Sequence, residues 1–252
     1  MTKIAFITGA TAGIGEACAK KMAKVGYDLI ISGRREENLN QLEEEILKEY
    51  QCNIYKLVLD VRQQKEVFEV INSLPEEWKK IDLLVNNAGL AVGVSALQDG
   101  VIDDWERMID TNIKGLLYIT KAVSPLMIER KQGHIINITS IAGKEVYPGG
   151  NVYCATKHAA DALTKGMRID MLPHNIKVTS IAPGMVETEF SIVRFKGDKD
   201  KADQVYNGFT PLYAEDIADT VEFIATRPAH VNINDILIMP TAQASARDVV
   251  RN

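Results

Sequence analysis

The chain has 252 residues, of which 46% are hydrophobic and 25% charged, and a chain of this length can bury a sizeable core. Its 29 basic and 34 acidic residues leave a formal net charge of −5, and no basic block stands out, which argues against a nucleic-acid partner. Three scattered cysteines lack metal or redox spacing, and no apolar run is long enough to span a membrane. The N-terminus reaches glycines too soon for a signal peptide. We therefore expect a cytoplasmic protein with no membrane partner and no metal.

Short apolar segments alternate with longer amphipathic ones along the whole chain. Segments typical of strands lie at 3–8, 28–32, 53–59, 82–87, 134–139, 177–182 and 235–239, and helical patterns lie near 14–25, 35–50, 63–73, 103–131, 151–171 and 215–226. The alternation predicts a single-domain Rossmann fold, a doubly wound parallel sheet of about seven strands with helices on both faces. A less regular segment at 184–213 predicts a substrate-loop insertion. Ligands of such sheets bind beyond the carboxyl ends of the strands, so motifs placed there are site candidates.

The first motif, TGATAGIG, follows the first predicted strand and opens the first predicted helix. Gly9, Gly13 and Gly15 would let the backbone approach a phosphate, and the helix N-terminus would supply free N–H groups for the anion. The spacing G-x-x-x-G-x-G differs from the common G-x-G-x-x-G. An ordinary glycine-rich turn is the alternative, but the position in the first strand–helix unit favours a dinucleotide site.

The second motif, ISGRREEN, follows the second predicted strand. Proteins that bind a free ribose 2′-hydroxyl usually carry an acidic residue here, whereas this chain has Ser32, Gly33, Arg34 and Arg35. A guanidinium suits a 2′-phosphate, so the motif favours NADP over NAD. For Arg34 we favour the phosphate role. For Arg35 a place on a solvated helix face, with the two glutamates that follow, is equally open.

Tyr153 and Lys157 lie four residues apart near the start of a predicted helix, so both side chains share one face. A free tyrosine has a pKa of about 10 and is a poor base at neutral pH. A nearby ammonium favours the phenolate, so we expect Lys157 to lower the pKa of Tyr153 and to make the pair an acid/base unit. The spacing Y-x-x-x-K alone is common on surface helices.

Two further residues accompany this pair. Ser140 follows the strand predicted at 134–139, and its hydroxyl could hold a substrate oxygen beside Tyr153. A cap or turn role for Ser140 is the alternative, and Thr139 is its nearest rival. Asn112 lies inside the long helical pattern 103–131, where asparagine is locally unfavourable. Its presence there suggests a kink, a water site, or both.

Together these motifs, with NNAG at 86–89 and APG at 182–184, strongly resemble the classical short-chain dehydrogenase/reductase family across essentially the whole chain. The resemblance implies a Rossmann fold, hydride transfer with a nicotinamide cofactor, and often a homotetramer. It implies that Tyr153 is the general acid/base, that Ser140 positions the substrate oxygen, that Lys157 binds the nicotinamide ribose and that Asn112 holds a relay water. The remaining implied cofactor contacts are Thr11, Ile14, Asp60, Val61, Asn87, Ala88, Gly89, Pro183, Gly184, Val186 and Thr188.

A narrower resemblance is carried by DTNIKGLLYIT, VETEFSIVRFKGD and RPAHVNINDILIMPTAQ. These segments look like the NADP-dependent 3-hydroxy acid dehydrogenases, also described as serine or L-allo-threonine dehydrogenases and malonic semialdehyde reductases. The implied reaction, on a CH–OH donor, oxidises the hydroxyl carbon of a 3-hydroxy acid, or reduces a semialdehyde in reverse. A small carboxylate substrate needs a cation, and Arg194 is our candidate. A salt bridge of Arg194 to Glu187 or Glu189 is equally open.

Two other functions remain open from the sequence. A short-chain reductase of neutral ketones, aldehydes or 3-oxoacyl thioesters would carry the same catalytic residues, because substrate choice lies in variable loops. A non-catalytic NADP-binding regulator would have no need of an acid/base pair. Lys144 and Tyr147 are weaker candidates for the substrate pocket, and Cys154 is expected only to pack.

Overall fold

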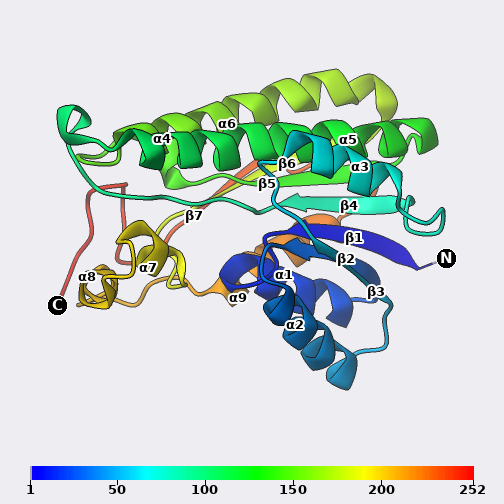
Figure 1. Ribbon diagram of the computed structural model, residues 1–252, viewed down its shortest axis with the longest axis horizontal. Helices are drawn as coiled ribbons and strands as arrows, with labels where there is room; N and C mark the ends of the chain where they lie inside the picture. The colour runs from blue at the N-terminus through cyan, green and yellow to red at the C-terminus, as the bar shows by residue number, and fades with distance from the viewer. Residues whose placement is uncertain (1) are drawn as a thin grey trace.

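The computed structural model describes residues 2–252 and contains one sheet of seven parallel strands (Figure 1). The strands are β1 (Lys3–Thr8), β2 (Tyr27–Gly33), β3 (Ile54–Val58), β4 (Ile81–Asn86), β5 (Gly133–Ile138), β6 (Ile176–Pro183) and β7 (Asp235–Ile238). Their order in the sheet is β3-β2-β1-β4-β5-β6-β7. The chain therefore winds in one direction from β1 to β3 and in the other from β4 to β7, which places a ligand crevice beyond the carboxyl ends of β1 and β4.

Helices cover both faces of the sheet, as the alternating pattern predicts. Figure 1 shows α1 (Gly13–Lys24), α2 (Glu36–Glu49) and α9 (Ala214–Ala225) on one face. The opposite face carries α3 (Gln64–Asn72), α5 (Leu116–Arg130) and α6 (Asn151–Met171), with α4 (Ile102–Ile109) preceding α5. Each helix presents an apolar stripe to the sheet, and the two resulting cores lie on either side of the central strands.

Burial differs between the central and the edge strands. Phe6 of β1, Leu84 of β4 and Ile135 of β5 are fully buried, as a sheet covered on both faces requires. In the edge strands, by contrast, Val58 of β3 is 48% exposed and Leu237 of β7 is 49% exposed. The apolar segments therefore identify the strands correctly, but the exposed Val58 and Leu237 show that hydrophobicity alone does not tell the edges from the centre.

One predicted helix is interrupted in the structure. The helical pattern 103–131 is not one α-helix, because a π-helical turn at Asp110–Gly115, labelled η2, separates α4 from α5. Asn112 lies in this turn and is buried. The locally unfavourable asparagine therefore does mark a distortion of the helix, as the sequence suggests.

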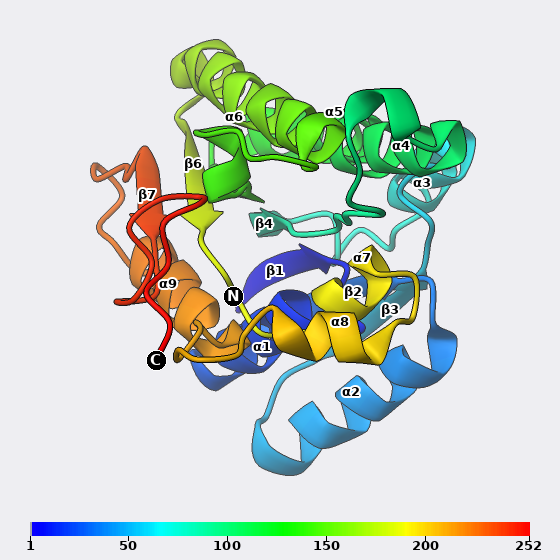
Figure 2. The ribbon, with the colours of Figure 1, turned by 90° about the vertical axis from the view of Figure 1, so that its left-hand side faces the viewer.

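The irregular segment 184–213 contains two short helices, α7 (Phe190–Arg194) and α8 (Lys199–Gln204). Figures 1 and 2 show both of them beyond the carboxyl ends of the strands, on the side where the ligand crevice is expected. Short 3₁₀ turns follow β4, β5 and α6, at Leu97–Asp99 (η1), Ile141–Gly143 (η3) and Leu172–His174 (η4).

Candidate active site

The glycine loop after β1 has a backbone that side chains would not permit. Gly9 and Gly13 have φ angles of +67° and +54°, in the left-handed region that favours glycine. A Cβ atom on Gly15 would lie 2.2 Å from the carbonyl oxygen of Gly9. The loop is therefore closely folded at the N-terminus of α1, where free N–H groups can meet a phosphate.

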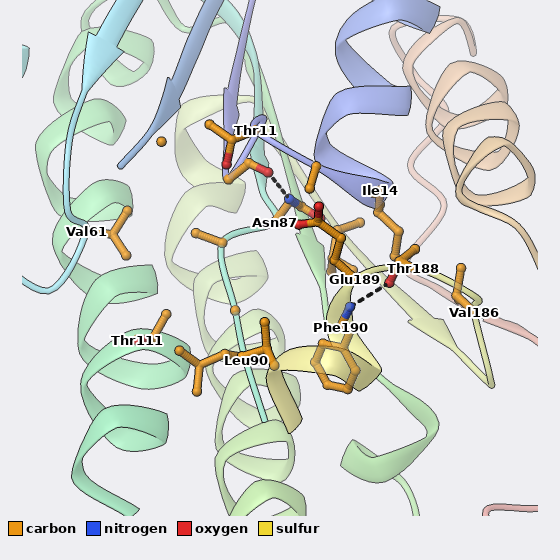
Figure 3. A pocket seen from close by; sticks show the side chains of 18 of the residues that line it. Thr11, Ile14, Val61, Asn87, Leu90, Thr111, Val186, Thr188, Glu189 and Phe190 are labelled. Atoms are coloured by element: carbon orange, nitrogen blue, oxygen red, sulfur yellow. Dashed lines mark hydrogen bonds between the residues drawn. The ribbon is translucent and has the colours of Figure 1, made fainter. Parts of the chain in front are cut away.

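The segment after β4 holds this loop in place. The Thr8 hydroxyl accepts hydrogen bonds from the backbone N–H groups of Asn87 and Ala88 at 3.0 and 3.1 Å. The Asn87 amide donates to the carbonyl oxygens of Thr8 and Gly9 at 2.9 and 3.1 Å. The two loops that flank the crevice thus form one hydrogen-bonded unit, part of which is visible in Figure 3.

A cavity of about 290 Å³ runs along this crevice. It extends from the arginines after β2 to the tyrosine of α6. Almost every predicted cofactor residue lines it: Gly9, Thr11, Gly13, Ile14, Ser32, Arg34, Arg35, Asp60, Val61, Asn87, Ala88, Gly89, Tyr153, Lys157, Pro183, Gly184, Val186 and Thr188. Gly15 does not line it and instead lies against the loop backbone.

Some lining residues were not predicted from the sequence. Arg107 comes from α4, Thr111 from η2 and Leu90 from the segment after β4, while Phe190 begins α7 and Glu189 directly precedes it. The motif at Asn112 does not identify Thr111, since consecutive residues of a helix face different directions. No local signal identifies Glu189, because its position depends on how the segment 184–213 folds back.

The end of the cavity beside β2 is suited to an anion. The Ser32 hydroxyl is buried and has no hydrogen-bond partner within residues 2–252, and Arg34 lines the cavity beside it. Arg35 does not simply join a solvated face. Its guanidinium donates to the Thr11 carbonyl oxygen at 3.0 Å and to a Glu189 carboxylate oxygen at 3.0 Å.

Asp60 and Val61 lie at the predicted adenine region. Asp60 accepts hydrogen bonds from the Arg62 guanidinium, the shortest at 2.6 Å. Burial acts to raise the pKa of Asp60, but the hydrogen bonds from Arg62 outweigh it and the pKa is lowered. Asp60 therefore stays a carboxylate at neutral pH, and it can accept a hydrogen bond from an adenine amine. The buried Thr111 hydroxyl has no partner within the described residues.

Tyr153 and Ser140 meet at the other end of the cavity. Tyr153 lies in the first turn of α6 and is 9% exposed, and Ser140 is the second residue after β5. Ser140 accepts a hydrogen bond from the backbone N–H of Ala142 at 3.0 Å, so it also has the capping role considered from the sequence. Burial raises the pKa of Tyr153 strongly, while the nearby Ser140 hydroxyl and the charge of Arg194 act to lower it.

Lys157 lies one turn further along α6, within the site, and its ammonium group already has a hydrogen-bond partner. Its ammonium donates to the carbonyl oxygen of Ile138 at 3.0 Å, and its nitrogen lies 6.0 Å from the Tyr153 ring centroid. Burial lowers the pKa of Lys157 to about 8. The expectation of a lowered Tyr153 pKa is therefore wrong, because both groups are buried and burial is the larger influence.

Asn112 is held by both ends of its amide. Its side-chain nitrogen donates to the Leu90 carbonyl oxygen at 2.8 Å and to the Thr156 hydroxyl at 3.0 Å, and its oxygen accepts from the Leu90 N–H at 2.9 Å. Asn112 does not line the cavity. A Cβ atom on Gly89 would lie 3.2 Å from its oxygen and 3.5 Å from the Lys157 nitrogen, so Gly89 keeps this region open.

Arg194 lies over two aromatic rings of the site. Its guanidinium carbon is 5.3 Å from the Tyr147 ring centroid and 6.0 Å from that of Tyr153. Within residues 2–252, Arg194 forms no salt bridge, and its buried Nε atom has no partner. The alternative of a salt bridge to Glu187 or Glu189 is therefore wrong, since Glu189 pairs with Arg35.

Tyr147 and Lys144, the two weaker candidates for the substrate pocket, have different surroundings. Tyr147 contacts Arg194 and belongs to the apolar cluster around Tyr153. Lys144 instead forms ion pairs with Asp161 and Asp235 at 2.6 and 2.7 Å, and it does not line the cavity. Cys154 is buried in the same cluster as Tyr153, in line with a packing role.

A parallel sheet with a glycine loop after its first strand, and a serine, tyrosine and lysine at the same edge, defines the class of Rossmann-fold oxidoreductases. The model of the short chain dehydrogenase family matches residues 3–199. The chain belongs to the short chain dehydrogenase family. Within residues 2–252, no helix is both long and apolar enough to cross a membrane.

Named relatives cover almost the whole chain. It is 48% identical to "NADP-dependent 3-hydroxy acid dehydrogenase YdfG" of Salmonella typhi over 96% of this chain and 97% of that protein. It is 47% identical to "Sulfoacetaldehyde reductase 2" of Chromohalobacter salexigens over 97% of this chain and 96% of that protein. Among solved structures, the closed form of serine dehydrogenase complexed with NADP+ matches with a TM-score of 0.93 and 46% identity, covering 99% of both chains.

Proposed function

We propose that this protein is an NADP-dependent dehydrogenase of small 3-hydroxy acids. The observation that carries the proposal is the position of Arg194, whose guanidinium lies 6.0 Å from the Tyr153 ring without any carboxylate partner in the described chain. A fixed positive charge beside the reacting group favours a substrate that carries a carboxylate. The relatives named for 3-hydroxy acid and serine dehydrogenation support this class of substrate.

The cavity fits NADP. The glycine loop and the N-terminus of α1 would hold the pyrophosphate. The buried, unpartnered Ser32 hydroxyl and the Arg34 guanidinium would hold the 2′-phosphate, and Asp60 and Val61 would flank the adenine. Lys157 would hold the nicotinamide ribose. The residues proposed along the nicotinamide end are Asn87, Ala88, Gly89, Pro183, Gly184, Val186 and Thr188.

When bound, NADP would accept a hydride from the hydroxyl carbon of the substrate, or return one in reverse. Ser140 would hold the substrate oxygen, and Tyr153 would exchange its proton with that oxygen. In the reductive direction, the burial that raises the pKa of Tyr153 keeps its phenol protonated and ready to donate. In the oxidative direction, the Ser140 hydroxyl and the charge of Arg194 act in favour of the phenolate.

The test compares substrates with and without an anionic group. Reduction of NADP is followed by absorbance with L-serine, L-allo-threonine, 3-hydroxypropionate and a neutral secondary alcohol, and oxidation of NADPH is followed with sulfoacetaldehyde. We expect turnover on the anionic compounds. Turnover on the neutral alcohol alone would leave the catalytic group intact and identify a carbonyl reductase of neutral compounds instead.

Arg194→Leu tests the anion site directly. Loss of a charge-assisted contact should lower kcat/KM for hydroxy acids about 10- to 100-fold, while the neutral alcohol changes little. Arg227→Leu is the matched control, because its guanidinium also stacks on an aromatic ring, 4.4 Å from the Phe223 centroid, but that ring belongs to α9 and not to the apolar cluster around Tyr153. Equal losses on charged and neutral substrates would contradict the role of Arg194.

The proposal also covers the oligomeric state and the location of the enzyme. As in many members of this family, a homotetramer in the cytoplasm is proposed, with the segment 184–213 as the substrate loop of a single domain. Size-exclusion chromatography with light scattering measures the assembly. A monomer in solution would contradict that part of the proposal and leave the catalytic site untouched.

A further inference from the structure

The pair formed by Arg35 and Glu189 joins two parts of the cavity that are 154 residues apart in the sequence. Arg35 precedes α2 and lies beside the predicted 2′-phosphate site, whereas Glu189 immediately precedes α7. One guanidinium nitrogen of Arg35 donates to Glu189 at 3.0 Å, and the other donates to the Thr11 carbonyl oxygen at 3.0 Å. Both Arg35 and Glu189 line the cavity.

The charges at this end of the cavity do not all favour a phosphate. Ser32, Arg34 and Arg35 could each contact an anion there, but Glu189 brings a carboxylate to the same guanidinium that a 2′-phosphate would use. A phosphate monoester carries close to two negative charges at neutral pH, so it is repelled by Glu189 and competes with it for Arg35. The pair is also half exposed, with side-chain exposures of 47% and 55%, and exposed pairs are weak.

We propose that Glu189 is a specificity-determining residue that weakens binding of the cofactor's 2′-phosphate by competing for Arg35. The inference rests on the proposed use of NADP. The phosphate displaces the carboxylate from Arg35 on binding, and the carboxylate returns when the cofactor leaves. Because Glu189 directly precedes the helix that carries Phe190 and Arg194, the exchange also links the phosphate site to the segment over Tyr153.

The experiment measures binding rather than turnover. Isothermal titration gives the dissociation constants of adenosine 2′,5′-bisphosphate and of AMP, which differ only in the 2′-phosphate, for the wild type and for Glu189→Gln. We expect Glu189→Gln to bind the bisphosphate about 3- to 10-fold more tightly, since a like charge at short range has been removed, and to bind AMP unchanged. Glu187→Gln is the matched control, because it removes the same charge from the same segment but lies outside the cavity lining.

A double-mutant cycle with Arg35→Leu identifies the contact that mediates the effect. If Glu189 acts through Arg35, Glu189→Gln should have a smaller effect on the bisphosphate when Arg35 is already leucine. Weaker or unchanged bisphosphate binding in Glu189→Gln, or an equal gain for AMP, would overturn the inference alone. A wild type that binds the bisphosphate no better than AMP would overturn the NADP assignment and the inference with it.

Discussion

Replacing Lys157 by methionine should stabilise the protein and abolish its activity. Burial lowers the pKa of Lys157 from 10.5 to about 8. Because one pKa unit corresponds to 1.36 kcal/mol, the buried ammonium costs the folded state about 3 kcal/mol at neutral pH. Methionine keeps much of the side-chain volume without the charge, but it loses the hydrogen bond to the Ile138 carbonyl oxygen, worth about 1 to 2 kcal/mol. We therefore expect a net gain of about 1 to 2 kcal/mol in the free energy of unfolding.

The pH dependence gives a second, independent measure of the same cost. Lys157 loses its proton near pH 8 in the folded state but only near 10.5 in the unfolded state. Between these values the unfolded state binds more protons, so the wild type gains about 1.4 kcal/mol of stability per pH unit from this group. The methionine variant lacks this gain, so its advantage should be full below pH 8 and should shrink and then reverse as the pH rises toward 10.

Urea unfolding, followed by the fluorescence of Trp78 and Trp105, measures both effects at pH 7, 8, 9 and 9.5. Lys121→Met, at an exposed position of α5, controls for the loss of a lysine as such. Turnover should fall at least ~100-fold in Lys157→Met if this lysine serves the acid/base step. A variant that is less stable than the wild type at pH 7, with an unchanged pH dependence, would refute the reasoning from burial.

Three further perturbations test other parts of the molecule. Gly89→Ala would place a Cβ atom 3.2 Å from the Asn112 oxygen, so kcat/KM should fall about 10-fold or more while the melting temperature changes little. Burial lowers the pKa of His134 to about 3 from the ordinary 6.5. Below pH 6.5 the unfolded state therefore binds one more proton than the folded state, and the free energy of unfolding falls by about 1.4 kcal/mol per pH unit. His134→Gln should remove this slope, as measured by urea unfolding at pH 7, 6 and 5. Lys196→Met breaks the 2.7 Å ion pair to the buried Asp104, and limited proteolysis within 184–213 should become about 5-fold faster, whereas Lys196→Arg should behave like the wild type.

The sheet could be predicted because its information is local. Each strand is a short and mostly apolar segment, and all seven predicted strands occur in the structure within one residue of their expected ends. Glycines after the first strand and arginines after the second follow directly from those boundaries. What the pattern could not give is the sheet order or the exposure of edge residues such as Val58, because both depend on which strands become neighbours.

The electrostatics of the site could not be predicted for the same reason. Tyr153 and Lys157 are adjacent on one helix face, so the sequence shows the attraction between them but not the depth at which both are buried. Burial then decides the direction of both pKa shifts. The contact of Arg35 with Glu189 is similarly invisible, because it depends on how the segment 184–213 returns to the sheet.

Asn112 could be predicted only in part from the sequence. An asparagine is unfavourable inside a helix, which indicates a distortion there, but the hydrogen bonds that it makes are to residues distant in the sequence. The π-helical turn gives up regular α-helical hydrogen bonding, yet the Asn112 amide makes three hydrogen bonds, two to the Leu90 backbone and one to Thr156. These bonds join the α4–α5 region to the loop after β4, which carries Gly89, and to α6, which carries Lys157. The distortion is therefore tied to the geometry of the site, since a regular helix at 110–115 would turn the amide away from these partners and leave the Leu90 backbone without them.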